Sequence, residues 1–372
     1  MRTPCSALVL AGLTACAAPE PLDLPDDPAA STMPVGVRTY TLSDATLEVW
    51  YPATANTEGS GEQVDLGDYL PDAFTERVPE LDAPSYSTPA LRDAPPRSLA
   101  EPLPVVMFSH GFGAFRTQSA TLTAHLAARG YVVIAADHPG RMLTDIAPCL
   151  LSPFAGDCVL PNFGGGEDPA QAQLAVARAW LDDPDPELAP LIDTSSLGIF
   201  GHSAGGRSTA IYASENTEVD AALPLGGADA FSRDVPSAVI GGSCDAIIRE
   251  PALIDDGATT SEGYYSLRDA GHLAFSDLCR IDLGELGAVI EARDDASALV
   301  AGLISLGTDG CPGYEPTVNL ETCGDTFLDL DRSDLILKHA VTAFFDAHLR
   351  GEGGGLSTLT YPELVAPDAS SD

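Results

Sequence analysis

The residues with the clearest chemical meaning form a Gly-x-Ser-x-Gly motif, in which Ser203 stands between Gly201 and Gly205. An apolar run that begins at Leu197 leads into the motif, and residues 207–213 after it have the composition of a helix. A serine between a strand and a helix can be held in a strained conformation, with its hydroxyl exposed above a sheet. The glycines remove Cβ atoms that would collide in such a turn. The motif therefore predicts a nucleophilic serine, although a glycine-rich turn with an incidental serine has the same pattern.

A serine nucleophile needs a histidine base and a carboxylate that orients this base. In a strand-turn-helix context both follow the serine along the chain, the acid before the histidine. His272 lies in a glycine-flanked loop after a predicted strand, so we expect it to be the general base. His202 should point away from the pocket, while His339 and His348 fall in a predicted final helix, where packing or solvent contact is the simpler role.

Two aspartates between the serine and the histidine follow predicted strands and could be the acid. Asp245 comes directly after its strand, whereas Asp229 lies further along its loop, beyond Gly226. We therefore expect Asp245 to orient the histidine, and Asp229 remains the alternative.

Acyl transfer also needs donors for the oxyanion that develops in the transition state. The amide of Ala204 would lie at a helix N-terminus, which favours negative charge. The second donor should come from the loop after an earlier strand, where residues 109–113 make the amide of Phe112 the candidate. We expect His110 to shape this loop by hydrogen bonding rather than to catalyse.

The elements around these residues repeat strand, helix and strand with short connections. Strands are predicted at 103–108, 131–136, 197–202, 219–225, 237–241 and 264–267, and helices at 118–128, 169–181 and 207–213. This repeat predicts an α/β fold with a mostly parallel central sheet and helices on both faces.

The remaining segments are predicted to surround this sheet. Residues 35–51 should form an opening hairpin, and the Pro-rich segment 52–104 an irregular cover. Residues 141–167 form a loop insertion where a lid would lie, and 281–326 form a second insertion. A closing amphipathic helix is expected at 335–349, capped by Ser333 or Asp331.

The charge of the chain is strongly acidic, with 18 Lys and Arg against 55 Asp and Glu residues and a net charge of −37. Such a surface repels nucleic acid and anionic membranes, so we expect neither as a partner. Solubility is the simplest reason for this charge. No HExxH motif is present, and the aspartates at 329, 331 and 334 lack the glycine of a calcium loop. We therefore expect no metal and no cofactor.

The first residues have the features of an export signal. Arg2 precedes a short apolar run at 7–13, which is too short to span a bilayer. Leu13-Thr14-Ala15-Cys16 resembles the lipobox of bacterial lipoproteins, which implies acylation of Cys16; an ordinary signal peptide is the alternative. We expect an envelope lipoprotein, or otherwise a secreted or periplasmic protein. The expected layout is a signal peptide at 1–15, a tether at 16–34, one domain at 35–350 and a polar tail at 351–372.

Cysteines are the last group with possible chemistry. Of the eight, Cys5 lies in the predicted signal peptide and Cys16 is the predicted acylation site, and the others are Cys149, Cys158, Cys244, Cys279, Cys311 and Cys323. In an exported chain they indicate disulfides, and no pair has the CxxC spacing of a zinc site. The connectivity stays open. A Cys244–Cys279 bridge would tie the acid loop to the base loop, which leaves local pairs at 149–158 and 311–323.

The run from Phe108 to Thr117, FSHGFGAFRT, resembles the platelet-activating-factor acetylhydrolase (group VII phospholipase A2) family of α/β-hydrolases. Residues 201–206 fit that family as well, and the similarity extends with gaps over 35–349. The resemblance implies cofactor-free hydrolysis of carboxylic esters, with short or oxidised acyl chains cut from phospholipids. That family carries its acid just after the strand that follows the nucleophile, where this chain has Gly226-Gly227.

The segment 240–245 is instead similar to the acid loop of cutinase-type polyester hydrolases and dienelactone-hydrolase relatives. Residues 222–225 and the loop of His272 are similar to these proteins too. The expectation is an exported serine ester hydrolase that acts on short-chain or lipid-like esters. A polyester or lipase-like hydrolase with the same three residues is the alternative, and a catalytically inert surface-binding lipoprotein is less favoured. The oligomeric state is left open.

Overall fold

A computed structural model describes residues 33–54, 61–151, 168–281, 289–290, 292–296 and 327–366. The predicted signal peptide and nearly all of the tether, with Cys16, lie outside the described residues. So do Cys158, Cys311, Cys323 and most of the predicted insertion at 281–326.

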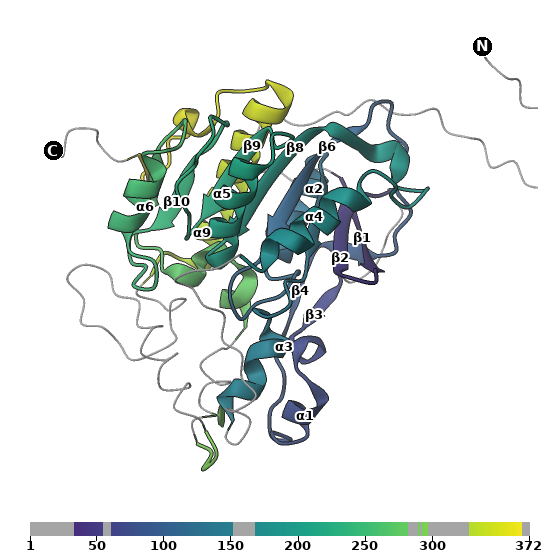
Figure 1. Cartoon of the computed structure of the whole chain (residues 1–372), viewed down its shortest axis with the longest axis vertical. Coiled ribbons are helices and arrows are strands. Elements are labelled where there is room, and N and C mark those ends of the chain that lie inside the picture. Colours follow the sequence, from purple (N-terminus) through teal and green to yellow (C-terminus); the bar gives the residue numbers. More distant parts are fainter. Residues whose placement is uncertain are drawn as a thin grey trace, which may run out of the picture.

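A ten-stranded sheet forms the centre of the molecule, in the order β12-β11-β10-β9-β8-β6-β7-β2-β1-β5. Figure 1 shows β6, β8, β9 and β10 of this sheet. Its strands are β1 (Val35–Thr41), β2 (Thr46–Pro52), β5 (Ala90–Arg92), β6 (Leu103–Ser109), β7 (Val132–Ala136), β8 (Ile192–His202), β9 (Ala221–Leu225), β10 (Val239–Gly242), β11 (Tyr264–Leu267) and β12 (Leu364–Val365). The pairs from β7 through β6, β8, β9 and β10 to β11 are parallel. The predicted, mostly parallel sheet is confirmed.

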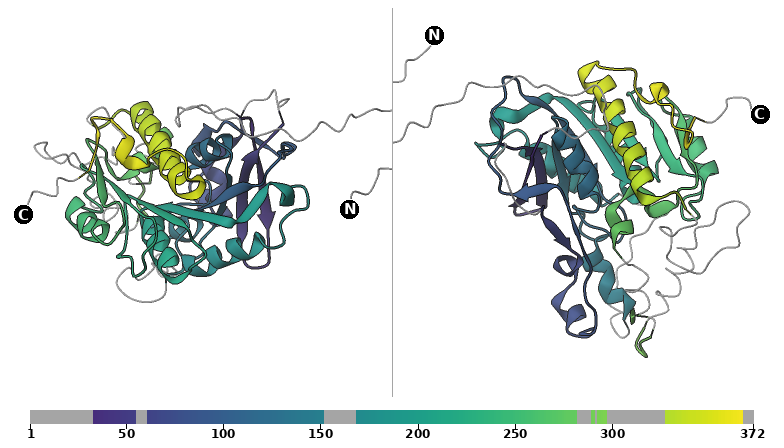
Figure 2. Two further views of the ribbon diagram at one scale, coloured as in Figure 1. Left: turned by 90° about the horizontal axis from the view of Figure 1, so that it is seen from above. Right: turned by 180° about the vertical axis from the view of Figure 1, so that it is seen from behind.

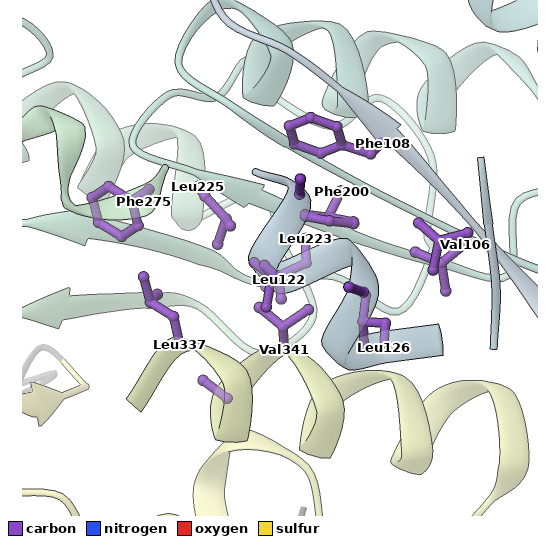
Figure 3. Close-up of a cluster of buried hydrophobic side chains, with 14 of the residues drawn as sticks. Val106, Phe108, Leu122, Leu126, Phe200, Leu223, Leu225, Phe275, Leu337 and Val341 are labelled. Atoms are coloured by element: carbon purple, nitrogen blue, oxygen red, sulfur yellow. The ribbon is translucent and has the colours of Figure 1, made fainter. Parts of the chain in front are cut away.

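Helices cover both faces of this sheet (Figure 2). The described helices are α1 (Asp72–Thr75), α2 (Ala120–Ala128), α3 (Leu143–Ile146), α4 (Ala170–Trp180), α5 (Ala204–Glu215), α6 (Glu250–Gly257) and α9 (Leu330–Phe345). Leu122 and Leu126 of α2 and Val341 of α9 pack with Phe108 and Phe200 of the sheet (Figure 3). A separate apolar cluster joins α4 and α5 to the opposite face.

The predicted hairpin is confirmed, since β1 pairs antiparallel with β2. The expectation that 52–104 is irregular is wrong in part. This segment contains α1, the antiparallel pair of β3 (Gln63–Asp65) and β4 (Ser85–Ser87), and β5, which extends the main sheet beside β1. Tyr86 is buried, and its hydroxyl donates to the Thr117 carbonyl at 2.7 Å. These elements are too short for a periodic pattern to reveal them.

The closing helix begins earlier than predicted and has a different cap. The Asp329 carboxylate accepts from the Arg332 amide at 3.0 Å, so Asp329 caps α9 in place of Ser333 or Asp331. Ser333 is fully buried inside the helix, and its hydroxyl donates to the Ala274 carbonyl. A side chain buried in this way is unavailable to the helix end.

The predicted polar tail also contributes to the fold, because β12 pairs antiparallel with β11. The hydrogen-bonded sheet therefore continues past residue 350. Within the described ranges, no helix is long and apolar enough to cross a membrane.

The carboxyl ends of the parallel strands lie along one edge of the sheet. These ends are Ser109 of β6, Ala136 of β7, His202 of β8, Leu225 of β9, Gly242 of β10 and Leu267 of β11. Ligands of open α/β sheets bind outside this edge. The predicted catalytic residues and oxyanion donors each follow one of these strands within a few positions.

Candidate active site

Ser203 stands in a sharp turn between β8 and α5, with φ 57° and ψ −123°. A positive φ is uncommon for a residue with a side chain, so the surrounding structure must hold it there. Its amide donates to the Leu225 carbonyl at 2.9 Å, and its carbonyl accepts from the Gly206 amide at 2.9 Å. A Cβ at Gly205 would collide with the Ser109 carbonyl at the end of β6, so the turn packs directly on its neighbouring strand.

The structure brings Ser203, His272 and Asp245 together in one hydrogen-bonded chain. His272 Nε2 lies 2.8 Å from Ser203 Oγ, and His272 Nδ1 lies 2.7 Å from Asp245 Oδ2. The other carboxylate oxygen accepts from the amides of Ile247 and Ile248, each at 2.8 Å. Because the carboxylate can only accept from Nδ1–H, Nε2 is left to accept the serine proton.

Backbone contacts hold the acid loop against the base loop. The Cys244 amide donates to the Ala270 carbonyl at 3.0 Å, and the Ser243 amide donates to the Leu267 carbonyl at 3.0 Å. In return, the Asp269 amide donates to Ser243 Oγ at 2.9 Å. Asp245 and His272 are almost entirely buried, so their relative position depends on these contacts.

Asp229, the alternative acid, has other partners in the structure. Its carboxylate pairs with the Arg207 guanidinium at 3.0 Å and accepts from the Ala230 amide at 2.9 Å. Gly227, two residues after β9, cannot be replaced by an acid either, because a Cβ there would lie 2.7 Å from the Ser203 carbonyl carbon. The acid position of the acetylhydrolase-like pattern is sterically closed here.

The loop after β6, which contains Phe112, lies beside Ser203. A Cβ added at Gly111 would lie 3.3 Å from Ser203 Cβ. The amides on either side of Phe112 are fixed: Gly111 N donates to Gln118 Oε1 and Gly113 N donates to the Arg141 carbonyl, each at 2.7 Å. The second predicted donor, Ala204, is the first residue of α5.

His110 has the hydrogen bonds of a loop-shaping residue, in agreement with its predicted role. Its Nδ1–H donates to the Gly111 carbonyl at 2.8 Å, and its Nε2 accepts from the His138 amide at 3.1 Å. Complete burial, together with the positive charge of Arg141, holds the pKa of His110 well below its usual value. The imidazole therefore stays neutral and fixes the peptide that carries the Phe112 amide.

Arg141 is a site residue that the sequence reasoning missed. Its buried guanidinium donates to the His110 carbonyl at 2.8 Å, to Ser208 Oγ at 2.8 Å and to the Ala204 carbonyl at 3.4 Å. Asp168 lies 3.3 Å away, and burial lowers the pKa of Arg141 to about 10. A basic residue shortly after β7, in a chain with so few basic residues, is the signal that could have identified it.

Gln118 is a second missed residue, and it explains the orientation of His202. The Gln118 side-chain amide lies 2.5 Å from His202 Nδ1, and His202 Nε2 lies 2.8 Å from the His272 carbonyl oxygen. His202 is turned into the protein, as predicted, but it contacts the base loop. The signal for Gln118 is a polar residue two positions before the apolar start of α2.

Three of the predicted disulfide cysteines are among the described residues. Cys149 lies shortly after α3, Cys244 directly before Asp245, and Cys279 in the short helix η6 (Asp277–Arg280). Among the residues that the structure describes, no group of three or more His, Cys, Asp or Glu side chains is placed to hold a metal ion.

Comparison with known proteins supports this architecture. Residues 34–144 match the model of the family "platelet-activating factor acetylhydrolase, isoform II". Cutinase est1 of Thermobifida alba is 28% identical over 179 residues, which cover 45% of this chain and 53% of that protein. The chain thus matches about half the length of this curated relative.

A solved structure of a ferulic acid esterase from Streptomyces cinnamoneus superposes with a TM-score of 0.59. It is 21% identical, and the match covers 94% of this chain and 99% of that one. The molecule therefore has an α/β-hydrolase fold, and the predicted resemblance to acetylhydrolases and cutinases is confirmed.

Proposed function

We propose that the protein is a carboxylic ester hydrolase in which Ser203 is the nucleophile, His272 the general base and then acid, and Asp245 the orienting acid. The observation that carries this proposal is the continuous chain from Ser203 Oγ through both imidazole nitrogens to the Asp245 carboxylate. A nucleophile hydrogen-bonded to a base that a third group orients is the recognised arrangement for acyl transfer.

In the first half-reaction, Ser203 Oγ attacks the ester carbonyl carbon while His272 Nε2 takes the hydroxyl proton. The carbonyl oxygen becomes an oxyanion, to which the amides of Phe112 and Ala204 are the proposed donors. Collapse of this intermediate breaks the bond to the alcohol oxygen, which leaves with the proton from His272. The product is an acyl-Ser203.

In the second half-reaction, His272 deprotonates a water molecule that attacks the acyl carbon. The carboxylic acid is then released and the proton returns to Ser203 Oγ. Asp245 keeps Nδ1 protonated and stabilises the imidazolium in both halves. No step in this sequence needs a cofactor.

The test is esterase activity of the purified protein and of its Ser203→Ala variant. Wild type should hydrolyse short p-nitrophenyl esters without added metal, and an organophosphate should add to the protein mass and stop turnover. Ser203→Ala should lower kcat by ~10⁴-fold or more, and should not be labelled. Wild-type turnover in this variant would refute the role of Ser203.

The substrate that we propose is a short-chain or lipid-like ester, supported by the family match over the loop that contains Phe112. A polyester or cutinase-like substrate is the second candidate, because the sequence is related to a cutinase. A p-nitrophenyl ester series separates them. A steep loss of kcat/KM beyond butyrate supports the short-acyl substrate, and release of soluble products from an aliphatic polyester film supports the second.

We further propose that Cys244 and Cys279 form a disulfide that joins the acid loop to the segment after the base. This proposal is supported by their places in the chain, since Cys244 directly precedes Asp245 and Cys279 lies in η6, after the loop of His272. For the remaining cysteines, of which Cys149 is among the described residues, the local pairs 149–158 and 311–323 remain the proposal.

Export and attachment through Cys16 are also proposed, from the lipobox-like sequence of 13–16. Intact-mass measurement of the detergent-extracted protein should show a chain that begins at an acylated Cys16. A released chain without this modification would indicate an ordinary signal peptide.

A further inference from the structure

A buried hydrogen-bonded chain connects the two loops on either side of Ser203. It runs from the Gly111 amide to Gln118 Oε1 at 2.7 Å, from Gln118 Nε2 to His202 Nδ1 at 2.5 Å, and from His202 Nε2 to the His272 carbonyl at 2.8 Å. Gln118 and His202 are 1% and 2% exposed. Water cannot replace these partners without rearrangement of the core.

The direction of every hydrogen bond in this chain is determined by its ends. The Gly111 amide can only donate, so Gln118 accepts through its carbonyl oxygen and presents its NH₂ group to His202. Nδ1 of His202 must then accept, which leaves the proton on Nε2. The His272 carbonyl can only accept that proton, so a single tautomer of His202 satisfies all three bonds.

The chain ends at the two backbone segments that the proposed reaction requires in fixed positions. Gly111 precedes the proposed donor Phe112, and a Cβ at Gly111 would lie 3.3 Å from both Ser203 Cβ and the His202 carbonyl oxygen. At the other end the His202 and His272 rings lie 4.8 Å apart between centroids. Acyl transfer requires such groups to be held within ~0.5 Å of their productive geometry.

We propose that Gln118 is a positioning residue that, through His202, couples the oxyanion loop to the loop of the general base. This proposal rests on the proposed ester hydrolase function. It adds the residues that fix the position of the oxyanion loop relative to the loop of His272. His202 suits this role because burial and the neighbouring His272 hold its pKa well below the usual value. A neutral His202 adds no charge that would oppose protonation of His272 during turnover.

The first test is a double-mutant cycle with Gln118→Met and His202→Phe, which keep size and shape but remove the hydrogen bonds. Each single variant should lower kcat by about 10- to 100-fold with little change in KM, because the reacting groups are misplaced rather than substrate binding lost. Since one break interrupts the whole chain, the double variant should be no slower than the slower single variant.

Thr123→Val is the matched control. Thr123 is equally buried on α2, and its hydroxyl donates to the Ala120 carbonyl at 3.1 Å, away from the chain. Its kcat should remain at the wild-type value. A phenylboronic acid, which forms a tetrahedral adduct with a nucleophilic serine, gives a second measurement. The affinity of the boronic acid should fall in parallel with kcat for the Gln118 and His202 variants, but not for Thr123→Val.

Gln118→Glu keeps the test decisive if the methionine variant does not fold. The glutamate still accepts from Gly111 but has no NH₂ group, so it draws the His202 proton to Nδ1 and weakens the bond to the His272 carbonyl. This variant should also lose kcat. Wild-type kcat in folded Gln118→Met or Gln118→Glu would overturn the coupling, as would losses that multiply in the double variant. An active Ser203→Ala protein would instead refute the proposed function itself.

Discussion

Gly227 determines where the acid of this site can stand. Its backbone lies so close to that of Ser203 that a Cβ would come within 2.8 Å of Ser203 Cα. A carboxylate at this position, two residues after β9, would therefore displace Ser203. The acid that we propose, Asp245, instead follows the next strand, β10, and its second oxygen accepts from two amides.

At the same scale, we predict that Asp245→Asn lowers kcat by ~10⁴-fold, because an amide can stabilise the wrong tautomer of His272 and carries no charge to balance the imidazolium. Asp229→Asn is the matched control, since its carboxylate is part of a half-exposed ion pair with Arg207. It should keep nearly all activity. Steady-state kinetics of both variants, with melting curves to confirm folding, decide the assignment. A dead Asp229 variant would return the acid to the loop after β9.

At the scale of elements, the long buried strands and the helices between them could be predicted from the sequence, because apolar periodicity is strong there. Strands of two or three residues, such as β5 and β12, could not, since their pairing depends on distant partners. The cap of α9 was misplaced for a related reason. Several aspartates and serines there are equivalent as a sequence pattern, and only the fold shows that Asp329 accepts from the helix amide while Ser333 is buried inside the helix.

In the candidate site, too, some residues could be predicted from the sequence and others could not. Ser203 and His272 could be predicted because a local motif and a glycine-flanked loop identify them. Gln118 and Arg141 could not, because their partners are carbonyl groups, amides and a ring from other segments. A backbone carbonyl has no sequence signature, so a residue that binds one becomes recognisable only when the fold is known.

The proposed disulfide would join the loop after β10 to η6, so its removal should affect both stability and activity. Replacing Cys244 and Cys279 together by serine should lower the free energy of unfolding by ~2–4 kcal/mol. It should also reduce kcat, because Asp245 is adjacent to the bridge. Urea unfolding without reductant and steady-state kinetics measure the two effects. A double variant with wild-type stability and rate would show that these cysteines do not form this bridge.

At the scale of the whole molecule, burial of neutral histidines makes stability depend on pH. The pKa values of His110, His138 and His202 all lie well below the usual value, chiefly because burial disfavours the charged ring. As the pH falls below ~6.5, the unfolded chain takes up protons that the folded protein does not. The contribution of these neutral histidines to the free energy of unfolding is therefore fully present above that pH. It decreases below that pH by at most ~1.4 kcal/mol per pH unit for each histidine.

The measurement is urea unfolding between about pH 7.5 and pH 5.5 for wild type and His138→Gln. The glutamine does not titrate, so the variant should show a smaller slope whatever its absolute stability. Asp137 and Asp277, whose carboxyl pKa values are raised by burial, act in the opposite direction in both proteins. The comparison between the two proteins therefore isolates the histidine. Equal slopes would mean that His138 takes up its proton in the folded state.

The strand β12 has a consequence for self-association. It occupies the outer side of β11, where the Arg268 amide also donates to the Glu363 carbonyl at 2.8 Å and Arg332 pairs with the Glu363 carboxylate at 2.9 Å. If the chain were cut after residue 350, β11 would present unpaired amides and carbonyls at an open edge, a template on which a second molecule could add a strand. The short segment after α9 thus acts as a built-in block against edge-to-edge aggregation, beside the loop that carries His272.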